Sequence, residues 1–190
     1  MAQFKEDVKC PKCRKKIRIK VIEKMNEEHI ESIINRSLFD VSCKECNETI
    51  VALYPFELET NNYLIYFDPA YDKKMIKDKN KKTIKRICNE YDDLKEKILI
   101  FEDKLNDVVI EFMKEFYSEQ IDEKLRKKMT GIRYNYIDNN QIIFSILGTN
   151  QNIGCPYSIY EELYRRSKIK KIKYATVIDE YTYRKYFKMR

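Results

Sequence analysis

The sequence predicts an α+β protein: an N-terminal β unit with an inserted helix, a central helical hairpin, and a C-terminal β-hairpin with helices. Apolar and charged residues alternate over 17–21, and a second apolar run covers 50–53, as is typical of short, half-buried strands. An apolar seam with steps of four and three runs from Ile87 to Phe112, and two β-rich runs flank residues 138–140. Strand and helix signals thus occupy separate stretches of the chain, which favours the α+β class.

The N-terminal region predicts three strands around one short helix. Basic residues separate the apolar positions of the first strand, 17–21, so one of its faces is buried. Asn26 is a suitable N-cap for a helix over 27–37, because the isoleucines that follow recur at helical spacing. Strands over 50–53 and 62–67 follow, the second on its aromatic and β-branched content.

The central region is predicted to be helical after a lysine-rich start. Residues 73–86 contain few apolar side chains and indicate a loop or the exposed start of a helix. The seam from Ile87 to Phe112 then fits either one long helix or two antiparallel helices broken near Asp103, because Asp103 and Asn106 are both good caps. A helical hairpin is the commoner of the two in a compact domain.

Gly131 ends the helical region, and a β-hairpin is predicted after it. Residues 132–137 and 141–147 have strand composition, with Asp138-Asn139-Asn140 as the turn between them. The sequence then predicts, in order, a loop over 149–155, a helix that begins at Pro156, a strand over 169–177 and a closing helix from Asp179.

Composition limits the classes of protein that this chain can represent. Of its 190 residues 43% are hydrophobic, enough for a core, and 36% are charged. No apolar run is long enough to cross a bilayer, and the first residues lack the apolar stretch of a secretory signal. We therefore expect a cytoplasmic protein without a membrane partner, whose six cysteines stay reduced.

Four of the cysteines form two Cys-x-x-Cys turns, Cys10-Pro-Lys-Cys13 and Cys43-Lys-Glu-Cys46. A tight turn points two thiolates at one ion, and two such turns supply the tetrahedral four-sulfur shell of structural zinc sites. We predict that Cys10, Cys13, Cys43 and Cys46 bind one structural Zn²⁺. Iron offers an alternative for four thiolates, and redox chemistry an alternative for a single pair.

The two turns depart from the common pattern in two ways. Residues 14–42, 29 in number, separate the pairs, whereas about 15 to 20 are usual; the helix over 27–37 explains the excess as an insertion between two strands. Glycine is common after the second cysteine, where φ tends to be positive, but here Arg14 and Asn47 follow. Asn tolerates that geometry better than Arg, so we expect the first turn to be the more strained or the more open.

The chain resembles the bacterial CpXC family, named for such cysteine pairs, over residues 8 to 125. The resemblance is carried by both Cys pairs, by Arg86-Ile-Cys-Asn-Glu-Tyr-Asp-Asp-Leu-Lys-Glu-Lys-Ile98, and by Ile100-Phe101, Leu105-Asn106-Asp107 and Ile110-Glu111. Lys44 stands where a proline would complete Cys-Pro-x-Cys in the second pair. The resemblance implies zinc ligands, a zinc-ribbon-like N-terminal unit, and two domains, 1–125 and a C-terminal α+β extension over 126–190. It implies no activity.

The sequence lacks the usual signatures of an enzyme. Its single histidine, His29, lies on the polar side of the predicted helix, and three glycines cannot build a Gly-rich phosphate loop. Four thiolates would fill the zinc shell and leave no position for a catalytic water. We expect a non-catalytic protein without a small-molecule substrate.

Two functions remain, and they differ in the class of partner. The first is a zinc-stabilised module that binds a protein. The second is a nucleic-acid-binding module that uses the basic residues beside the first turn, Arg14, Lys15, Lys16, Arg18 and Lys20. Tyrosines interleaved with lysines over 170–188 could stack on bases or belong to the core.

Overall fold

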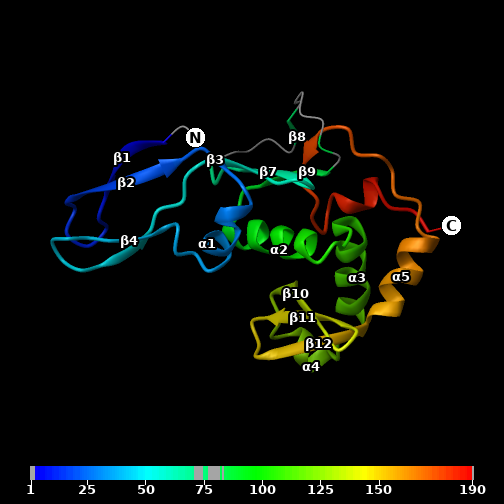
Figure 1. Ribbon diagram of the computed structural model, residues 1–190. Coiled ribbons are helices and arrows are strands. Elements are labelled where there is room, and N and C mark those ends of the chain that lie inside the picture. Colours follow the sequence, from blue (N-terminus) through cyan, green and yellow to red (C-terminus); the bar gives the residue numbers. More distant parts are fainter. Residues whose placement is uncertain (1–2, 71–74, 77–81, 83, 190) are drawn as a thin grey trace. The chain divides into compact units, whose positions relative to one another are not determined.

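The computed structural model describes residues 3–70, 75–76, 82 and 84–189, and it combines helices and strands (Figure 1). The chain forms two compact units. The N-terminal unit contains residues 1–95 and 174–176, and the C-terminal unit contains 96–173 and 177–190. The predicted α+β class is confirmed, and the boundary predicted between residues 125 and 126 falls inside the C-terminal unit. In the described part of the chain, every helix is too short or too polar to span a membrane.

Two antiparallel hairpins carry the Cys-x-x-Cys turns at their tips. The first pairs β1 (Gln3–Lys9) with β2 (Lys16–Ile22), and the second pairs β4 (Asp40–Ser42) with β5 (Thr49–Val51) (Figure 1). Strand β2 alternates as predicted, with its isoleucines and valine buried and its basic residues exposed. Strand β1 was not predicted, because the side chains of residues 4–9 are exposed or half-buried and give no alternation.

A short helical segment connects the two hairpins. It follows β3 (Lys24–Met25) and consists of a 3₁₀ turn, Glu27–His29, and helix α1, Ile30–Ile34. The predicted helix over 27–37 is therefore present but shorter. It ends early because Arg36 adopts a positive φ of 69°, which no α-helix can continue through.

A six-stranded sheet forms the core of the N-terminal unit. Its order is β3-β6-β7-β9-β13-β8. Strand β7 pairs antiparallel with β6 and parallel with β9. The strands not yet introduced are β6 (Phe56–Glu59), β7 (Tyr63–Phe67), β8 (Met75–Ile76), β9 (Ile84–Cys88) and β13 (Ala175–Thr176).

Strand β9 corrects the prediction of a loop or helix start over 73–86, and it removes Ile87 from the helical seam. Lys85 and Arg86 are only 7% and 4% exposed, although such residues normally face water. The Arg86 guanidinium donates a hydrogen bond to the Lys85 carbonyl at 2.8 Å. Two buried charges within a five-residue strand hide it from a hydrophobic pattern. Part of the predicted segment, 71–74, 77–81 and 83, lies outside the described residues.

The helical seam breaks into two helices, α2 (Tyr91–Glu102) and α3 (Asp107–Gln120). The break falls near Asp103, as the two-helix alternative predicted. The Asn106 side chain caps α3, because it accepts hydrogen bonds from the N–H groups of Val108 (3.1 Å) and Val109 (3.4 Å). The antiparallel arrangement stays a prediction. A one-turn helix, α4 (Glu123–Arg126), follows.

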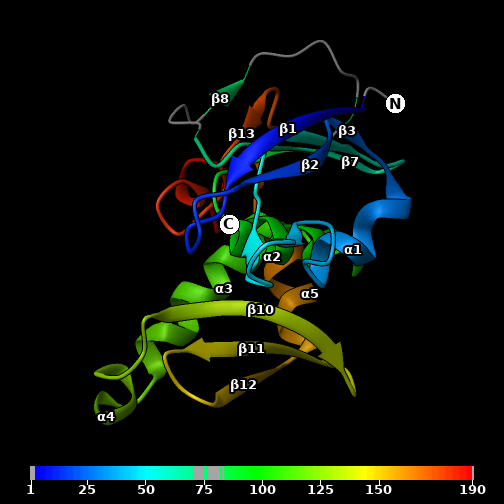
Figure 2. The ribbon, with the colours of Figure 1, turned by 90° about the vertical axis from the view of Figure 1, so that its left-hand side faces the viewer.

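The C-terminal unit contains a three-stranded antiparallel sheet of β10 (Gly131–Asp138), β11 (Gln141–Leu147) and β12 (Gln151–Pro156) (Figure 2). The hairpin is confirmed, and its turn residues Asn139 and Asn140 have φ values of 45° and 61°. The loop predicted over 149–155 is wrong. Strand β12 is polar and buries only Cys155, so its composition resembles that of a loop.

The chain after β12 follows the prediction less closely. Helix α5 (Tyr157–Arg166) begins after Pro156, as predicted. Of the strand expected over 169–177 only β13 forms, and a 3₁₀ turn, Tyr183–Lys185, replaces the closing helix. The tyrosines of this region divide: Tyr183 is buried, whereas Tyr181 is 75% exposed.

A cluster of buried ion pairs joins α2 to α3. Lys97 lies 2.8 Å from a carboxylate oxygen of Glu111 and 3.6 Å from one of Asp107. Lys114 lies 3.1 Å from Glu96 and 2.9 Å from Glu111. Glu96, Lys97, Asp107 and Glu111 are all less than 5% exposed. Because buried charges require partners, each member of this cluster depends on the others.

The same cluster reaches the three-stranded sheet. Glu96 accepts a hydrogen bond from the Tyr134 N–H of β10 at 2.6 Å. Three buried carboxylates, those of Glu96, Asp107 and Glu111, therefore help to hold the C-terminal unit together.

We expect Lys97→Met to destabilise the protein by about 3–5 kcal/mol, because it leaves Asp107 and Glu111 buried without this cation. The matched variant Lys95→Met, on the same helix but outside the cluster, should change stability by less than about 1 kcal/mol. Urea unfolding followed by circular dichroism measures both. Equal effects of the two variants would contradict the assignment of Lys97 to a stabilising cluster.

Candidate metal centre

The first turn is closed by two backbone hydrogen bonds. The Cys10 N–H donates to the Lys15 carbonyl at 2.9 Å, and the Arg14 N–H donates to the Cys10 carbonyl at 2.9 Å. These bonds connect the end of β1 to the start of β2 and turn the two cysteine side chains to one side of the hairpin tip. The local sequence suits the turn, since Pro11 has no N–H to satisfy and a φ that is already fixed.

The second turn repeats this pattern at equivalent positions. The Cys43 N–H donates to the Glu48 carbonyl, and the Asn47 N–H donates to the Cys43 carbonyl, both at 2.8 Å. Lys44 in place of a proline therefore leaves the turn intact. The near-identity of the two sets of distances shows that the first turn is not the more open one, so of the two expected alternatives only greater strain remains.

Backbone strain does distinguish the turns. Arg14 and Asn47 both have positive φ, 60° and 56°, as the preference for glycine at these positions predicts. Asparagine adopts this conformation readily, whereas a longer side chain pays a steric cost. The strain expected in the first turn is therefore located at Arg14, in its positive φ.

The four cysteine sulfurs converge on one point. All four lie within 4.8 Å of one another, and the Cys10–Cys46 and Cys13–Cys43 pairs are each 3.6 Å apart. A tetrahedron with metal–sulfur bonds of 2.3 Å has edges of about 3.8 Å. The cluster is therefore the right size to surround a single ion. Each close pair takes one sulfur from each hairpin, so a bound ion would connect the two hairpins to each other.

The acidity of the thiols differs across the cluster. The Cys13 N–H stabilises the Cys10 thiolate and lowers the pKa of Cys10 to about 7. At Cys46 the N–H of Glu48 acts in the same direction, but burial and the three neighbouring sulfurs outweigh it and raise the pKa to about 12. One thiol of the cluster thus ionises readily, whereas a second thiolate would be repelled by the first. A bound cation removes this repulsion and displaces the remaining thiol protons.

A charged pair crosses between the tips of the hairpins. The Lys12 ammonium lies 3.0 Å from a Glu48 carboxylate oxygen, and this carboxylate raises the pKa of Lys12. Both side chains are well exposed, so the pair contributes little stability. It indicates instead that the two turns face each other closely enough for side chains on their outer surfaces to meet.

The five basic residues predicted to bind nucleic acid all lie on the first hairpin and are all exposed. Arg14 and Lys15 belong to the metal turn, and the other three follow at alternate positions along β2. Two of them contact Asp7 of β1: Lys16 at 3.6 Å and Arg18 at 3.2 Å. Sequence reasoning missed the contribution of β1 to this surface, because that strand was not predicted.

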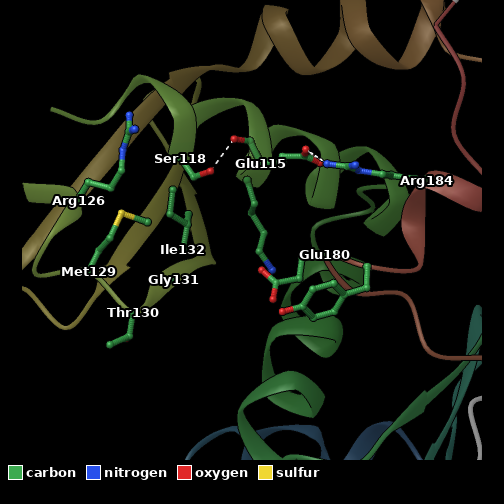
Figure 3. A pocket seen from close by; sticks show the side chains of 11 residues that line it. Glu115, Ser118, Arg126, Met129, Thr130, Gly131, Ile132, Glu180 and Arg184 are labelled. Atoms are coloured by element: carbon green, nitrogen blue, oxygen red, sulfur yellow. Dashed lines mark hydrogen bonds and ion pairs between the residues drawn. The ribbon is translucent and has the colours of Figure 1, made fainter. Parts of the chain in front are cut away.

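A cavity of about 710 Å³ lies in the C-terminal unit (Figure 3). Figure 3 shows Arg184 turned toward Glu115, with which it forms an ion pair, and Arg126 on the other side of the cavity. The Arg126 guanidinium donates hydrogen bonds to the carbonyls of Glu119 (2.6 Å) and Ile121 (2.8 Å). Both guanidinium groups are thus engaged by the protein itself, and the cavity gives no indication of a ligand.

Comparison with known proteins gives one match. A family model described as CpXC protein matches residues 8–114, a range that contains both Cys-x-x-Cys turns and ends before the limit of 125 expected from the resemblance. No curated protein and no solved structure matches the chain.

We expect Arg14→Gly to stabilise the metal-loaded protein by about 0.5–1 kcal/mol, because relief of the positive-φ strain exceeds the entropic cost of glycine. Asn47→Gly is the matched control in the second turn and should be neutral or slightly destabilising, since asparagine carries little strain there. Thermal unfolding of both variants tests this difference. A loss of stability in Arg14→Gly equal to that in Asn47→Gly would show that the first turn stores no strain.

Proposed function

The chain belongs to the CpXC family, and we propose that it is a non-catalytic zinc-binding module with one structural Zn²⁺ held by Cys10, Cys13, Cys43 and Cys46. The observation that carries the proposal is the convergence of these four sulfurs within 4.8 Å. Four thiolates at this spacing match the closed shell typical of structural zinc.

The spacing favours a single ion over an iron–sulfur cluster. A cluster places several iron and sulfide atoms between its cysteines, so its ligands lie farther apart than those of one ion. All four sulfurs lie within 4.8 Å of one another, which leaves room for one ion only. Between single ions, zinc is the one that structural four-cysteine sites commonly hold.

The proposed role of the zinc is to hold together hairpins that have little core of their own. The β4–β5 hairpin pairs over only three residues of each strand, and isolated two-stranded hairpins are marginal in water. A metal bond between their tips gives the two hairpins one fixed arrangement, as in a zinc ribbon with a helix inserted between its strands. A shell filled by protein ligands has no position for a reacting water, which supports a non-catalytic role.

A module of this kind would act through a binding surface, and we propose a protein partner. Large apolar side chains are exposed in both units, among them Phe4 and Val51 on the two hairpins and Phe116, Tyr136 and Tyr181 in the C-terminal unit. Exposed aromatic residues are enriched where proteins bind one another. Capture of proteins from a cell extract by the wild type and by Tyr181→Ala tests this part of the proposal. A protein that the wild type captures and that Tyr181→Ala captures less would support it, whereas equal capture of every protein would count against a binding surface at Tyr181.

Nucleic-acid binding is the second candidate function. One observation favours it: all five predicted basic residues are exposed on the hairpin whose tip carries the cysteine turn. Zinc would then fix the position of this basic surface.

We expect the purified protein to contain one zinc per chain and to lose it in Cys43→Ser, while Cys155→Ser, which alters a cysteine outside the cluster, keeps it. Chelation should increase hydrogen exchange over residues 3–51, because the hairpins lose their connection. Exchange over 131–156 serves as the internal control and should stay unchanged. If metal removal leaves exchange in the hairpins and the thermal unfolding of the protein unaltered, the ion is not structural.

A further inference from the structure

The register of the first hairpin places charged residues from both strands on one face. Lys5 is directly opposite Lys20, Asp7 is opposite Arg18, and Lys9 is opposite Lys16. Opposed residues of an antiparallel pair point to the same side, and successive side chains alternate between sides. The resulting surface, here called the basic face, consists of Lys5, Asp7, Lys9, Lys16, Arg18 and Lys20.

The basic face is directed to solvent. Ile17, Ile19 and Val21 occupy the alternate positions of β2 and are buried, which fixes the other side of β2 toward the protein. All six residues of the basic face are exposed. A ligand could therefore reach them without any rearrangement of the strands.

The charge of the face is strongly positive, and its single anion is placed to moderate it. Five cations and one carboxylate give a net charge of +4. Asp7 lies between Lys16 (3.6 Å) and Arg18 (3.2 Å), and the hydrogen bond from Arg18 lowers its pKa, so Asp7 is ionised at neutral pH. Removal of this carboxylate would raise the net charge without removing any cation.

The dimensions of the face suit the groove of a DNA duplex. Residues two apart on a strand repeat every ~6.7 Å, and opposed residues are separated by about 5 Å. The major groove of B-DNA, about 12 Å wide, admits a two-stranded β-ribbon, whereas the major groove of an RNA duplex is too narrow for side chains. Arg14 and Lys15 extend the positive charge to the tip of the hairpin.

The composition of the basic face disfavours the binding of single-stranded nucleic acid. Proteins that bind single-stranded nucleic acid commonly stack bases on aromatic side chains. None of the six residues of the basic face is aromatic, and Phe4 lies on the opposite side of β1.

We infer that the basic face of the β1–β2 hairpin binds double-stranded DNA, with lysines of both strands contacting phosphates. This inference rests on nucleic-acid binding, the second candidate function.

The test measures binding of the zinc-loaded full chain to a labelled 20-base-pair DNA duplex and to a single strand of the same sequence by fluorescence anisotropy. We expect the duplex to bind more tightly. With up to five phosphate contacts, its affinity should fall by roughly two to three orders of magnitude between 50 and 200 mM salt.

Three variants locate the binding surface. Lys5→Gln combined with Lys20→Gln removes one opposed pair and should weaken duplex binding and reduce the salt slope by about 2. The matched double variant Lys24→Gln and Lys124→Gln removes two exposed lysines outside the face and outside both cysteine turns and should have a much smaller effect. Asp7→Asn should strengthen binding several-fold, an outcome that a misfolded hairpin would not give. The zinc content of each variant verifies the integrity of the turns.

The outcomes separate the inference from the functions on which it rests. The inference that the basic face binds duplex DNA would be overturned if the single strand bound more tightly. It would also be overturned if the Lys5 and Lys20 changes did not weaken duplex binding. In both cases the chain would still bind nucleic acid. No salt-sensitive binding of either DNA would overturn both. Binding of anionic vesicles in the absence of duplex binding would assign the surface to membranes and overturn the inference. Zinc binding is measured independently and is unaffected by any of these results.

Discussion

The main constraint on the N-terminal unit is the convergence of four cysteine sulfurs from two hairpins. Two turns separated by residues 14–42 bring their cysteines within 4.8 Å. Burial and the three neighbouring sulfurs raise the pKa of Cys46 to about 12, which disfavours its thiolate in the absence of a cation. One divalent ion would stabilise the cysteine thiolates and at the same time connect the two short hairpins. The position of the basic face on the β1–β2 hairpin therefore depends on this connection.

Different electrostatic interactions contribute to the two units. In the N-terminal unit the hairpins would rely on a metal that the chain must acquire. In the C-terminal unit Lys97 and Lys114 neutralise carboxylates that the sequence itself provides, at distances of 2.8 and 2.9 Å from Glu111. Several charged residues that carry the resemblance to the family belong to this cluster. Their pattern is therefore explained by packing within the C-terminal unit, without reference to a ligand or a reaction.

Local signals in the sequence predicted the parts of the fold that local chemistry determines. The cysteine spacing predicted which sulfurs meet, Asn106 predicted the start of α3, and Asn139 with Asn140 predicted the β10–β11 turn. Elements that depend on tertiary contacts were missed. Strand β9 contains buried Lys85 and Arg86, and β1 and β12 are sparsely buried strands without alternation. The basic face could not be predicted, because it exists only through the pairing of β1 with β2.

X-ray absorption at the metal edge of the purified protein tests the central claim most directly, because it reports the identity of the ion and the atoms around it. The account requires zinc surrounded by four sulfurs at about 2.3 Å, with no second metal nearby. A shell that contains nitrogen or oxygen ligands, or scattering from a neighbouring iron, would contradict a closed four-cysteine zinc site and with it the proposed connection between the hairpins.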